Sequence, residues 1–217
     1  MHNIFSNNQN AFSNNDVVIE KTETVFSGFF RVLRYNLRHK LFNGEWSKSL
    51  QRELFVRGDS VGILLYDPAR DCVALTQQFR IGCLDNAAGA WVWEVVAGMV
   101  KPGENSTEVA LREVAEETGL QLQAAQLQAI THYYSSPGGT DERLQLYCAL
   151  CKLPPEIEGT YGLAEEGEDS RVRTFATTTV FDAMLAGTIN NAATIIALQW
   201  LQIIHATLRH QAVFTSS

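Results

Sequence analysis

The sequence predicts an α+β fold in which mixed β-strands pack in layers against three helices. Segments rich in Val, Ile, Thr and aromatic residues recur along the chain, as is typical of strands. Only three segments have the 3.6-residue periodicity of an amphipathic helix. Hydrophobic residues make up 46% and charged residues 19% of the 217 residues, a globular composition in a chain long enough to bury a core. Together these observations favour a layered α+β domain.

The N-terminal part is expected to be a small β block that follows a tail. Residues 1–15 contain six Asn residues and predict a solvated tail. Residues 16–57 form the block, with strands expected at residues 16–25, 29–38 and 50–57. Asn43 and Gly44 give a strong turn signal between the last two strands. The block is too short for a deep core of its own, so we expect it to pack on a neighbour.

Residues 58–217 are expected to form the main domain. Its predicted strands span residues 60–66, 72–78, 91–96, 126–134, 143–153 and 172–176. The first two flank a polar turn and predict a hairpin. Helices are expected at residues 105–118, 181–186 and 191–209, and Gly119 suits the position just past the first helix. Residues 154–169 are expected to be an acidic loop.

Composition excludes several classes of protein. The formal net charge is −7, so binding to nucleic acid through phosphate neutralisation is not expected. The sequence contains no run of about 18 apolar residues, so no transmembrane helix is predicted. The tail lacks the pattern of a signal peptide. Cys148 and Cys151 are spaced as CxxC, but their odd separation on a predicted strand points them to opposite faces, and a zinc site would need two more nearby ligands. We expect ordinary cysteines in a reducing, cytoplasmic compartment.

The segment that carries chemistry runs from Gly98 to Leu120. Its predicted helix buries an apolar face and gathers Glu113, Glu116 and Glu117 on the other. Arg112 lies four residues before Glu116 and can pair with it. An acidic helix face is most often a solvated surface, but here glycines and Pro102 define a strand–loop–helix unit around the acids. Carboxylates are preferred ligands of Mg²⁺, so the segment indicates an enzyme that uses Mg²⁺ and a phosphate substrate.

This segment resembles the Nudix box, G-x5-E-x7-R-E-U-x-E-E-x-G-U, in which U is a bulky aliphatic residue. Nine defined positions match, which makes the signal very specific: Gly98, Glu104, Arg112, Glu113, Val114, Glu116, Glu117, Gly119 and Leu120. Residues 136–140, Ser-Pro-Gly-Gly-Thr, are similar to a segment of the ADP-ribose pyrophosphatases within that family. The resemblance extends from about Phe26 to Leu208. It implies a Nudix α/β/α sandwich preceded by an N-terminal block used for dimerisation.

The resemblance also implies roles for individual residues. The metal ligands would be Glu113, Glu116, Glu117, Glu168 and the backbone carbonyl of Ala97. Glu166 would be the general base that activates water, although an acidic run such as 164–169 is by itself usually a solvated surface. Residues from the N-terminal block would reach the site of the partner subunit: Phe29, Phe30, Arg52, Glu53 and Arg57. Residues that would bind substrate in their own chain are Arg80, Met99, Ser136, Pro137, Gly138 and Glu142.

The function implied is the hydrolysis of ADP-ribose to AMP and ribose 5-phosphate by an ADP-ribose diphosphatase. Two or more Mg²⁺ ions per site are expected, with Mn²⁺ as the alternative metal, and the assembly is expected to be a homodimer with shared sites. Two other readings stay open. One is a Nudix hydrolase of another nucleoside diphosphate sugar, such as ADP-glucose or GDP-mannose. The other is a non-catalytic module that senses ADP-ribose.

Overall fold

A computed structural model describes residues 12–162, 167 and 169–215, the last five of them by their backbone alone. The chain divides into two compact units. Unit 1 contains Met1–Arg57 and Ser136–Asp141, and unit 2 contains Gly58–Ser135 and Glu142–Ser217. Strands and helices are present together in layers, so the predicted α+β class is confirmed.

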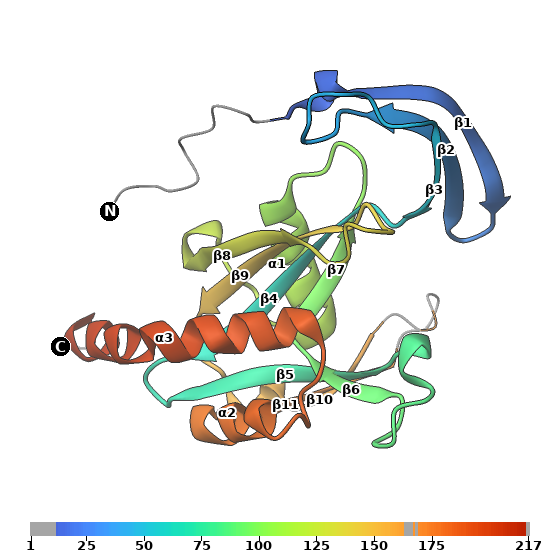
Figure 1. Cartoon of the computed structure of the whole chain (residues 1–217). Helices are drawn as coiled ribbons and strands as arrows, with labels where there is room; N and C mark the ends of the chain where they lie inside the picture. The colour runs from blue at the N-terminus through green and yellow to red at the C-terminus, as the bar shows by residue number, and fades with distance from the viewer. Residues whose placement is uncertain (1–11, 163–166, 168, 216–217) are drawn as a thin grey trace. The chain divides into compact units, whose positions relative to one another are not determined.

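Unit 1 is built around a three-stranded antiparallel sheet in the order β1-β2-β3. The strands are β1 (Val17–Ser27), β2 (Arg31–His39) and β3 (Leu50–Val56), close to the three expected (Figure 1). The predicted turn holds Gly44 at φ 85°, and the side chain of Asn43 accepts a hydrogen bond from the amide of Glu45 at 3.0 Å. The segment 136–141 joins this unit because the amide of Phe55 donates to the carbonyl of Gly139 at 2.8 Å.

Unit 2 contains an eight-stranded mixed sheet within the described residues. Its strands are β4 (Asp59–Asp67), β5 (Cys72–Phe79), β6 (Trp91–Glu94), β7 (Val96–Val100), β8 (Leu127–Tyr134), β9 (Arg143–Leu150), β10 (Gly159–Tyr161) and β11 (Ser170–Ala176). The order is β10-β11-β5-β4-β9-β8, with β6 on β5 and β7 on β4. β4 and β5 pair antiparallel next to the connecting turn, which confirms the predicted hairpin. β4 and β9 pair in parallel.

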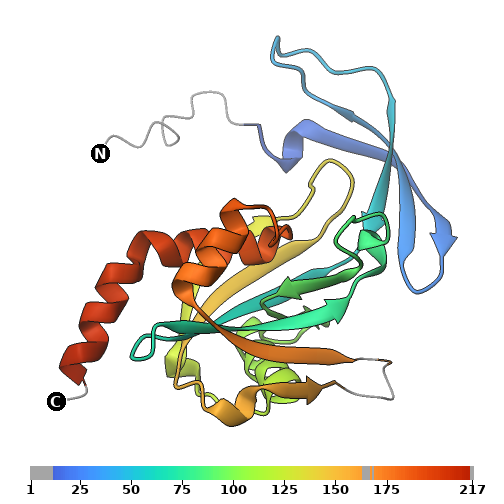
Figure 2. The ribbon, with the colours of Figure 1, turned by 90° about the horizontal axis from the view of Figure 1, so that it is seen from below.

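Helices cover both faces of this sheet, which makes a three-layer α/β/α unit. Helix α1 (Ser106–Thr118) lies on one face, and α2 (Thr177–Leu185) and α3 (Ala192–Thr215) lie on the other, as Figure 2 shows. Two apolar clusters fill the layers. Val109 and Val114 of α1 pack on the first, while Leu198 and Leu201 of α3 pack on the second.

Three expectations about elements are corrected. Residues 154–169 are not a loop throughout, because β10 pairs with β11 there. Helix α2 begins at Thr177, four residues before the expected start, and β9 ends at Leu150 instead of continuing to Leu153. The first two departures have no local signal. Three consecutive Thr residues have low helix propensity, and a three-residue strand has too little sequence to show alternation.

The cysteines behave as the sequence predicts. All four lie within the described residues and are free thiols. Cys148 packs in the cluster under α2 and α3, and Cys151 packs in the cluster under α1. Burial raises the pKa of both thiols, so they stay protonated and unreactive at neutral pH.

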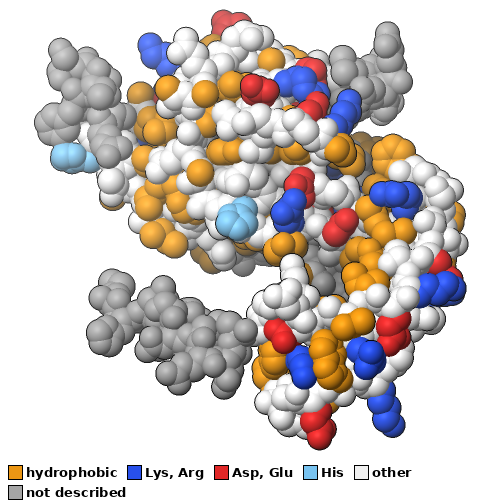
Figure 3. All heavy atoms as spheres, turned by 90° about the horizontal axis from the view of Figure 1, so that it is seen from above, with side chains coloured by type: hydrophobic (Ala, Val, Ile, Leu, Met, Phe, Trp, Pro, Cys, Tyr) orange, Lys and Arg blue, Asp and Glu red, His pale blue; other side chains and the backbone are white. Residues whose placement is uncertain are grey.

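On the face shown in Figure 3, Lys and Arg side chains are interspersed with Asp and Glu side chains. Within the part of the chain that is described, no helix is long and apolar enough to cross a membrane.

Candidate active site

The boundaries of helix α1 are set by local chemistry. The side-chain oxygen of Asn105 accepts from the amides of Thr107 at 2.8 Å and Glu108 at 3.4 Å, which satisfies donors that have no partner within the helix. At the other end Gly119 adopts φ 72° and donates to the carbonyl of Ala115 at 3.0 Å, a conformation that favours glycine. Because both ends are fixed, the positions of the glutamates between them are fixed as well.

Glu113 lies directly against the backbone of Gly98 on β7. A Cβ atom built on Gly98 would lie 2.1 Å from Cδ and 2.2 Å from Oε1 of Glu113, distances at which atoms collide. Only glycine therefore allows this carboxyl group to reach the strand. Gly98 follows Ala97, whose strand partner is Gly62. Gly98, the first glycine of the box, and Glu113 of its helix thus form one packing unit that joins strand and helix.

The three box glutamates on α1 differ in exposure, which corrects the expectation that all three lie on the helix face opposite the buried one. Glu117 is buried, with 5% of its surface exposed, Glu113 is half-buried, and Glu116 is exposed. Arg112 bridges two of them, with contacts of 3.0 Å to Glu113 and 3.4 Å to Glu116, so the predicted pair with Glu116 is confirmed. Among the described residues, no three His, Cys, Asp or Glu side chains are arranged as a metal-binding group.

The turn before the helix is closed by Glu104. Its Oε2 accepts from the amide of Lys101 at 2.8 Å, and its own amide donates to the carbonyl of Lys101 at 3.0 Å. Gly103 adopts φ 88° within this turn. Glu104 therefore holds the connection between β7 and α1, which brings the start of the helix next to the strand that carries Ala97 and Gly98.

Arg80 follows β5 and forms an ion pair with Glu94 of β6, with 2.5 Å between Nε and Oε2. Glu94 was not among the site residues predicted from the sequence. Its only signal is that it is the one carboxylate in the apolar segment 91–96. Met99 is exposed on β7, and the carbonyl of Glu142 accepts from the amide of Ser135 at 3.2 Å. These side chains all belong to unit 2.

Aromatic rings and one guanidinium group gather in unit 1. Phe30 contacts Phe29 and Phe55 edge to face, with ring centroids 4.7 and 4.9 Å apart. The guanidinium of Arg57 lies 4.9 Å from the centre of the Phe30 ring, and the amide of Arg57 donates to Oδ1 of Asp141 at 2.7 Å. Asp141 was also missed, because no spacing in the sequence links it to Arg57. Phe29 is 89% exposed, so this cluster offers an uncovered aromatic ring beside a cation.

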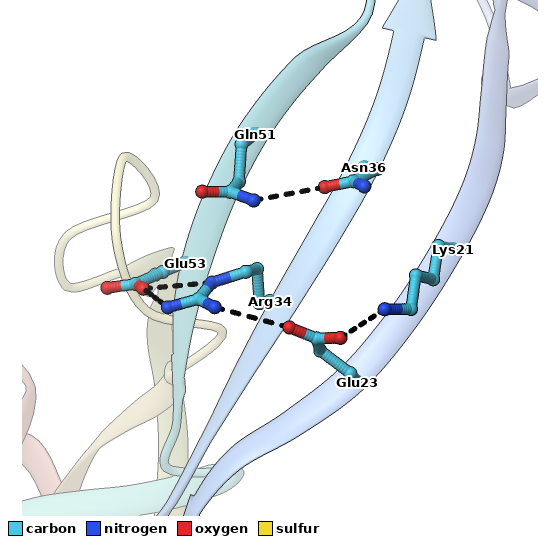
Figure 4. A network of polar contacts seen from close by, with 6 residues as sticks. All are labelled: Lys21, Glu23, Arg34, Asn36, Gln51 and Glu53. Carbon is cyan, nitrogen blue, oxygen red and sulfur yellow. Dashed lines mark hydrogen bonds and ion pairs between the residues drawn. The ribbon is translucent and has the colours of Figure 1, made fainter.

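The remaining N-terminal candidates lie on β3. Glu53 accepts from Arg34 at 2.8 Å, and Arg34 also contacts Glu23 at 3.2 Å, which forms a surface network across the sheet (Figure 4). The side chain of Arg52 donates to the carbonyl of Gln51 at 2.8 Å.

The segment with Ser136, Pro137 and Gly138 belongs to unit 1. The carbonyl of Ser136 accepts from the amides of Gly139 and Thr140 at 3.1 and 3.0 Å. Two further predicted residues, the general base Glu166 and the ligand Glu168, lie outside the described residues.

Comparison with known proteins identifies the family. The chain matches the profile of the NUDIX domain over residues 56–198. This chain belongs to the Nudix family. The match contains β4, helix α1 and the whole box described above.

Curated relatives cover nearly the full chain. It is 40% identical over 201 residues to the ADP-ribose pyrophosphatase of Escherichia coli (strain K12). This alignment covers 93% of this chain and 95% of that protein. It is 38% identical over 204 residues to the ADP-ribose pyrophosphatase of Haemophilus influenzae, with 91% of each chain covered. The GDP-mannose pyrophosphatase of Pectobacterium atrosepticum is 31% identical over 194 residues, covering 88% and 94%.

A solved structure shares the fold of this Nudix protein. The crystal structure of an ADP compounds hydrolase superposes with a TM-score of 0.67 at 20% identity, and the match covers 92% of this chain and 100% of that one. At this identity the likeness concerns the fold, and it supports the α/β/α architecture predicted from the sequence.

Proposed function

We propose that this Nudix enzyme hydrolyses the pyrophosphate bond of ADP-ribose, with water, to AMP and ribose 5-phosphate. The observation that carries the proposal is the placement of Glu113 against Gly98 with Glu117 buried one turn further on. Relatives that are 38–40% identical over more than nine-tenths of this chain are ADP-ribose pyrophosphatases, which supports the choice of substrate.

The residues around Gly98 fit a divalent cation. The carboxyl group of Glu113 lies on the strand backbone next to Ala97, and burial of Glu117 favours a cation that would balance its charge. Oxygen atoms are the ligands that Mg²⁺ prefers, and Mg²⁺ keeps several waters and adds substrate phosphates, so the protein need not supply a complete shell. We assign Glu113, Glu116, Glu117, Glu168 and the Ala97 carbonyl to two or more Mg²⁺ ions, or to Mn²⁺ in their place.

When bound, the metal would neutralise the pyrophosphate and lower the pKa of a coordinated water. Glu166 is the proposed base that takes the proton from the attacking water. Arg80 would contact a phosphate through its guanidinium, and the ion pair with Glu94 fixes the direction of that side chain. Met99 and Glu142 are the further proposed contacts from the same unit.

Unit 1 is proposed to bind the adenosine part of the substrate in a homodimer. The exposed ring of Phe29 and the cation over Phe30 suit a stacked adenine. Arg52, Glu53 and Arg57 would complete the contacts in the partner subunit's site, and Ser136, Pro137 and Gly138 would contact the substrate of their own chain. One face of the sheet presents half-buried apolar side chains, Leu33, Tyr35, Leu37, Leu50 and Leu54, and a second copy is the proposed cover for this face.

A second candidate substrate is another nucleoside diphosphate sugar, since GDP-mannose pyrophosphatases are also relatives. A panel of ADP-ribose, ADP-glucose and GDP-mannose, assayed with Mg²⁺ and scored by product identity, tests the proposal. We expect ADP-ribose to have the highest kcat/KM and to yield AMP, and EDTA to abolish turnover. A higher kcat/KM for either hexose nucleotide would overturn the choice of substrate. Binding of ADP-ribose without turnover in any metal would instead indicate a non-catalytic sensor.

A further inference from the structure

A pocket of about 440 Å³ lies in unit 2, and its described lining contains none of the site residues predicted from the sequence. Among the described residues, its lining combines one aromatic ring, one cation, one carboxylate and two neutral polar groups: Trp91, Arg171, Asp169, Gln77 and Thr160. A pocket of this size suits a small ligand. None of these residues has a role in the proposed hydrolysis.

Strand register places the pocket on the face of the sheet opposite helix α1. Val73 and Leu75 of β5 point into the cluster under α2 and α3, so Gln77, two residues further on, points to the same side. Gln77 is paired with Arg171 of β11 and with Trp93 of β6, and paired residues share a face. Gly98 and Glu113 lie on the α1 side, because the strand partner of Gly98 is Val61, which packs in the α1 cluster.

The guanidinium of Arg171 is held in place from two directions. It lies 5.7 Å from the centre of the Trp93 ring, and it donates a hydrogen bond to the side-chain oxygen of Gln77. The Trp93 ring in turn contacts Phe175 edge to face at 5.0 Å. Arg171 is itself exposed. A fixed guanidinium with N–H donors left over binds an anion with a smaller loss of side-chain entropy than a mobile one.

Trp91 supplies a flat surface next to this cation. It is 59% exposed, and its ring is supported by Phe79 at 5.4 Å between centroids. An indole ring that is more than half exposed suits a planar aromatic ligand. Asp169 and Thr160 add hydrogen-bonding groups that match ribose hydroxyls or an exocyclic amine.

We infer that this pocket is a second nucleotide site, which binds a nucleoside 5′-monophosphate with its base on Trp91 and its phosphate on Arg171. One guanidinium matches two oxygens of a single phosphate group. The carboxylate of Asp169 disfavours a ligand with more negative charge, such as a triphosphate. The inference uses only residues of the pocket and does not depend on the proposed hydrolysis.

Binding of AMP to the full-length protein in EDTA tests this site. Titration calorimetry would be run with AMP and with adenosine on the wild type, Arg171→Gln and Arg173→Gln. Arg173 is the matched control because it is an exposed arginine on the same strand and the same face but does not line the pocket. We expect Arg171→Gln to weaken one class of AMP sites at least tenfold, to leave adenosine affinity unchanged and to keep ADP-ribose turnover. Arg173→Gln should change none of these.

Quenching of tryptophan fluorescence by AMP should be lost in Trp91→Phe, a substitution that keeps an aromatic ring at this position.

Three results would overturn the inference. Equal AMP affinity in the wild type and Arg171→Gln would show that Arg171 does not contact the phosphate of AMP. A severe loss of turnover in Arg171→Gln would place the arginine in the hydrolytic site, so that no second site is needed. A change from dimer to monomer in Arg171→Glu, measured by sedimentation, would assign the face to contacts between copies. Failure of the proposed hydrolysis would appear separately, as absent turnover in the wild type.

Discussion

The site on helix α1 and the sheet of unit 1 hold their polar side chains in opposite ways. On α1, Glu117 is buried and Glu113 lies against a glycine that leaves no room for another atom. On the unit 1 sheet, Arg34, Glu53 and Glu23 form a network on an open surface (Figure 4). A polar group that cannot move and cannot exchange its partner for water matters far more than an exposed pair. The expected effects of substitution therefore fall from the first region to the second.

The largest effect is expected at the proposed base, which is assigned to the same proposed active site as the glutamates of α1. Glu166→Gln keeps the size of the side chain and removes its basicity, so kcat should fall by about 10²–10⁴. KM and metal affinity should change little, because the base is proposed to be separate from the ligands. Steady-state kinetics with ADP-ribose, together with Mg²⁺ titration, measures both. Glu165→Gln is the neighbouring control and should be nearly wild type. A fully active Glu166→Gln, or a disabled Glu165→Gln, would show that the base is assigned to the wrong residue.

Gly98→Ala tests whether the packing of Glu113 matters as much as its charge. The added methyl group would meet Glu113 at 2.1 Å, so strand and helix must separate. A misplacement of about 1 Å can cost about 100-fold in rate, and we expect kcat/KM to fall by about that much. Gly82→Ala is the control, because a Cβ atom there has open space. Wild-type rates in Gly98→Ala would mean that Glu113 is free to move without loss.

The sequence predicted the α1 region well because its signals are local. Asn105 and Gly119 mark the ends of the helix, and the apolar positions between them have helical spacing. The reason for Gly98 could not be read in the same way, since Glu113 lies 15 positions away and the contact exists only after folding. Glu94 and Asp141 were missed for the same reason: each meets its arginine through tertiary structure. Burial of Glu117 is likewise a property of the fold, not of the helix alone.

The apolar face of unit 1 offers a test of the proposed dimer. Leu54 is paired with Leu33 on one face of the sheet, and Gln51 lies on the other face with Asn36. Leu54→Glu should place a charge in the proposed interface, which would reduce the sedimenting mass from twice the 24.1 kDa chain to a single chain. ADP-ribose turnover should fall with it. Gln51→Glu is the control on the opposite face. If Leu54→Glu remains dimeric and active, this face of the sheet is not the dimer interface.

Stability should depend on a clamp that ties the β4–β5 turn to helix α3. Asp71 lies 2.6 Å from Nε2 of His205 and 3.0 Å from Arg209, and it accepts from Tyr66 at 3.1 Å. Partial burial opposes ionisation of Asp71, but hydrogen bonds from His205, Thr177 and Tyr66 outweigh it, so its pKa lies below the ordinary 3.8. Asp71→Asn should lower the free energy of unfolding by about 1–2 kcal/mol at pH 7.

Because the folded-state pKa of Asp71 is lowered, this stabilisation is present above about pH 4 and is lost as the pH falls through the folded value. Urea denaturation at pH 7 and at pH 3 should therefore show a difference between wild type and Asp71→Asn that shrinks in acid. A difference of the same size at both values would exclude ionised Asp71 as its source. ADP-ribose turnover should be unaffected at neutral pH, since the clamp is not part of the proposed site.

The smallest effect is expected in the surface network of unit 1. Arg34 donates to Glu53 through Nε and one terminal nitrogen, at 3.2 and 2.8 Å, and all members of the network are at least one-third exposed. Exposed ion pairs contribute little to stability and are screened by salt. Arg34→Gln should therefore lower Tm by less than about 2 °C, a difference that disappears in about 1 M salt.

Enzyme kinetics of Arg34→Gln test more than stability does, because Glu53 is a proposed substrate contact and the ion pair with Arg34 positions its side chain. Arg34→Gln should raise KM for ADP-ribose modestly and leave kcat unchanged, as expected for a positioning residue. Arg38→Gln is the matched control, since Arg38 lies on the same strand and face but pairs with Glu20 at 2.7 Å. If KM is unchanged in both variants, Glu53 belongs to the surface network alone. If kcat falls by about 100-fold in Arg34→Gln, the open sheet positions the reacting groups as tightly as helix α1 does, and the contrast between the two regions fails.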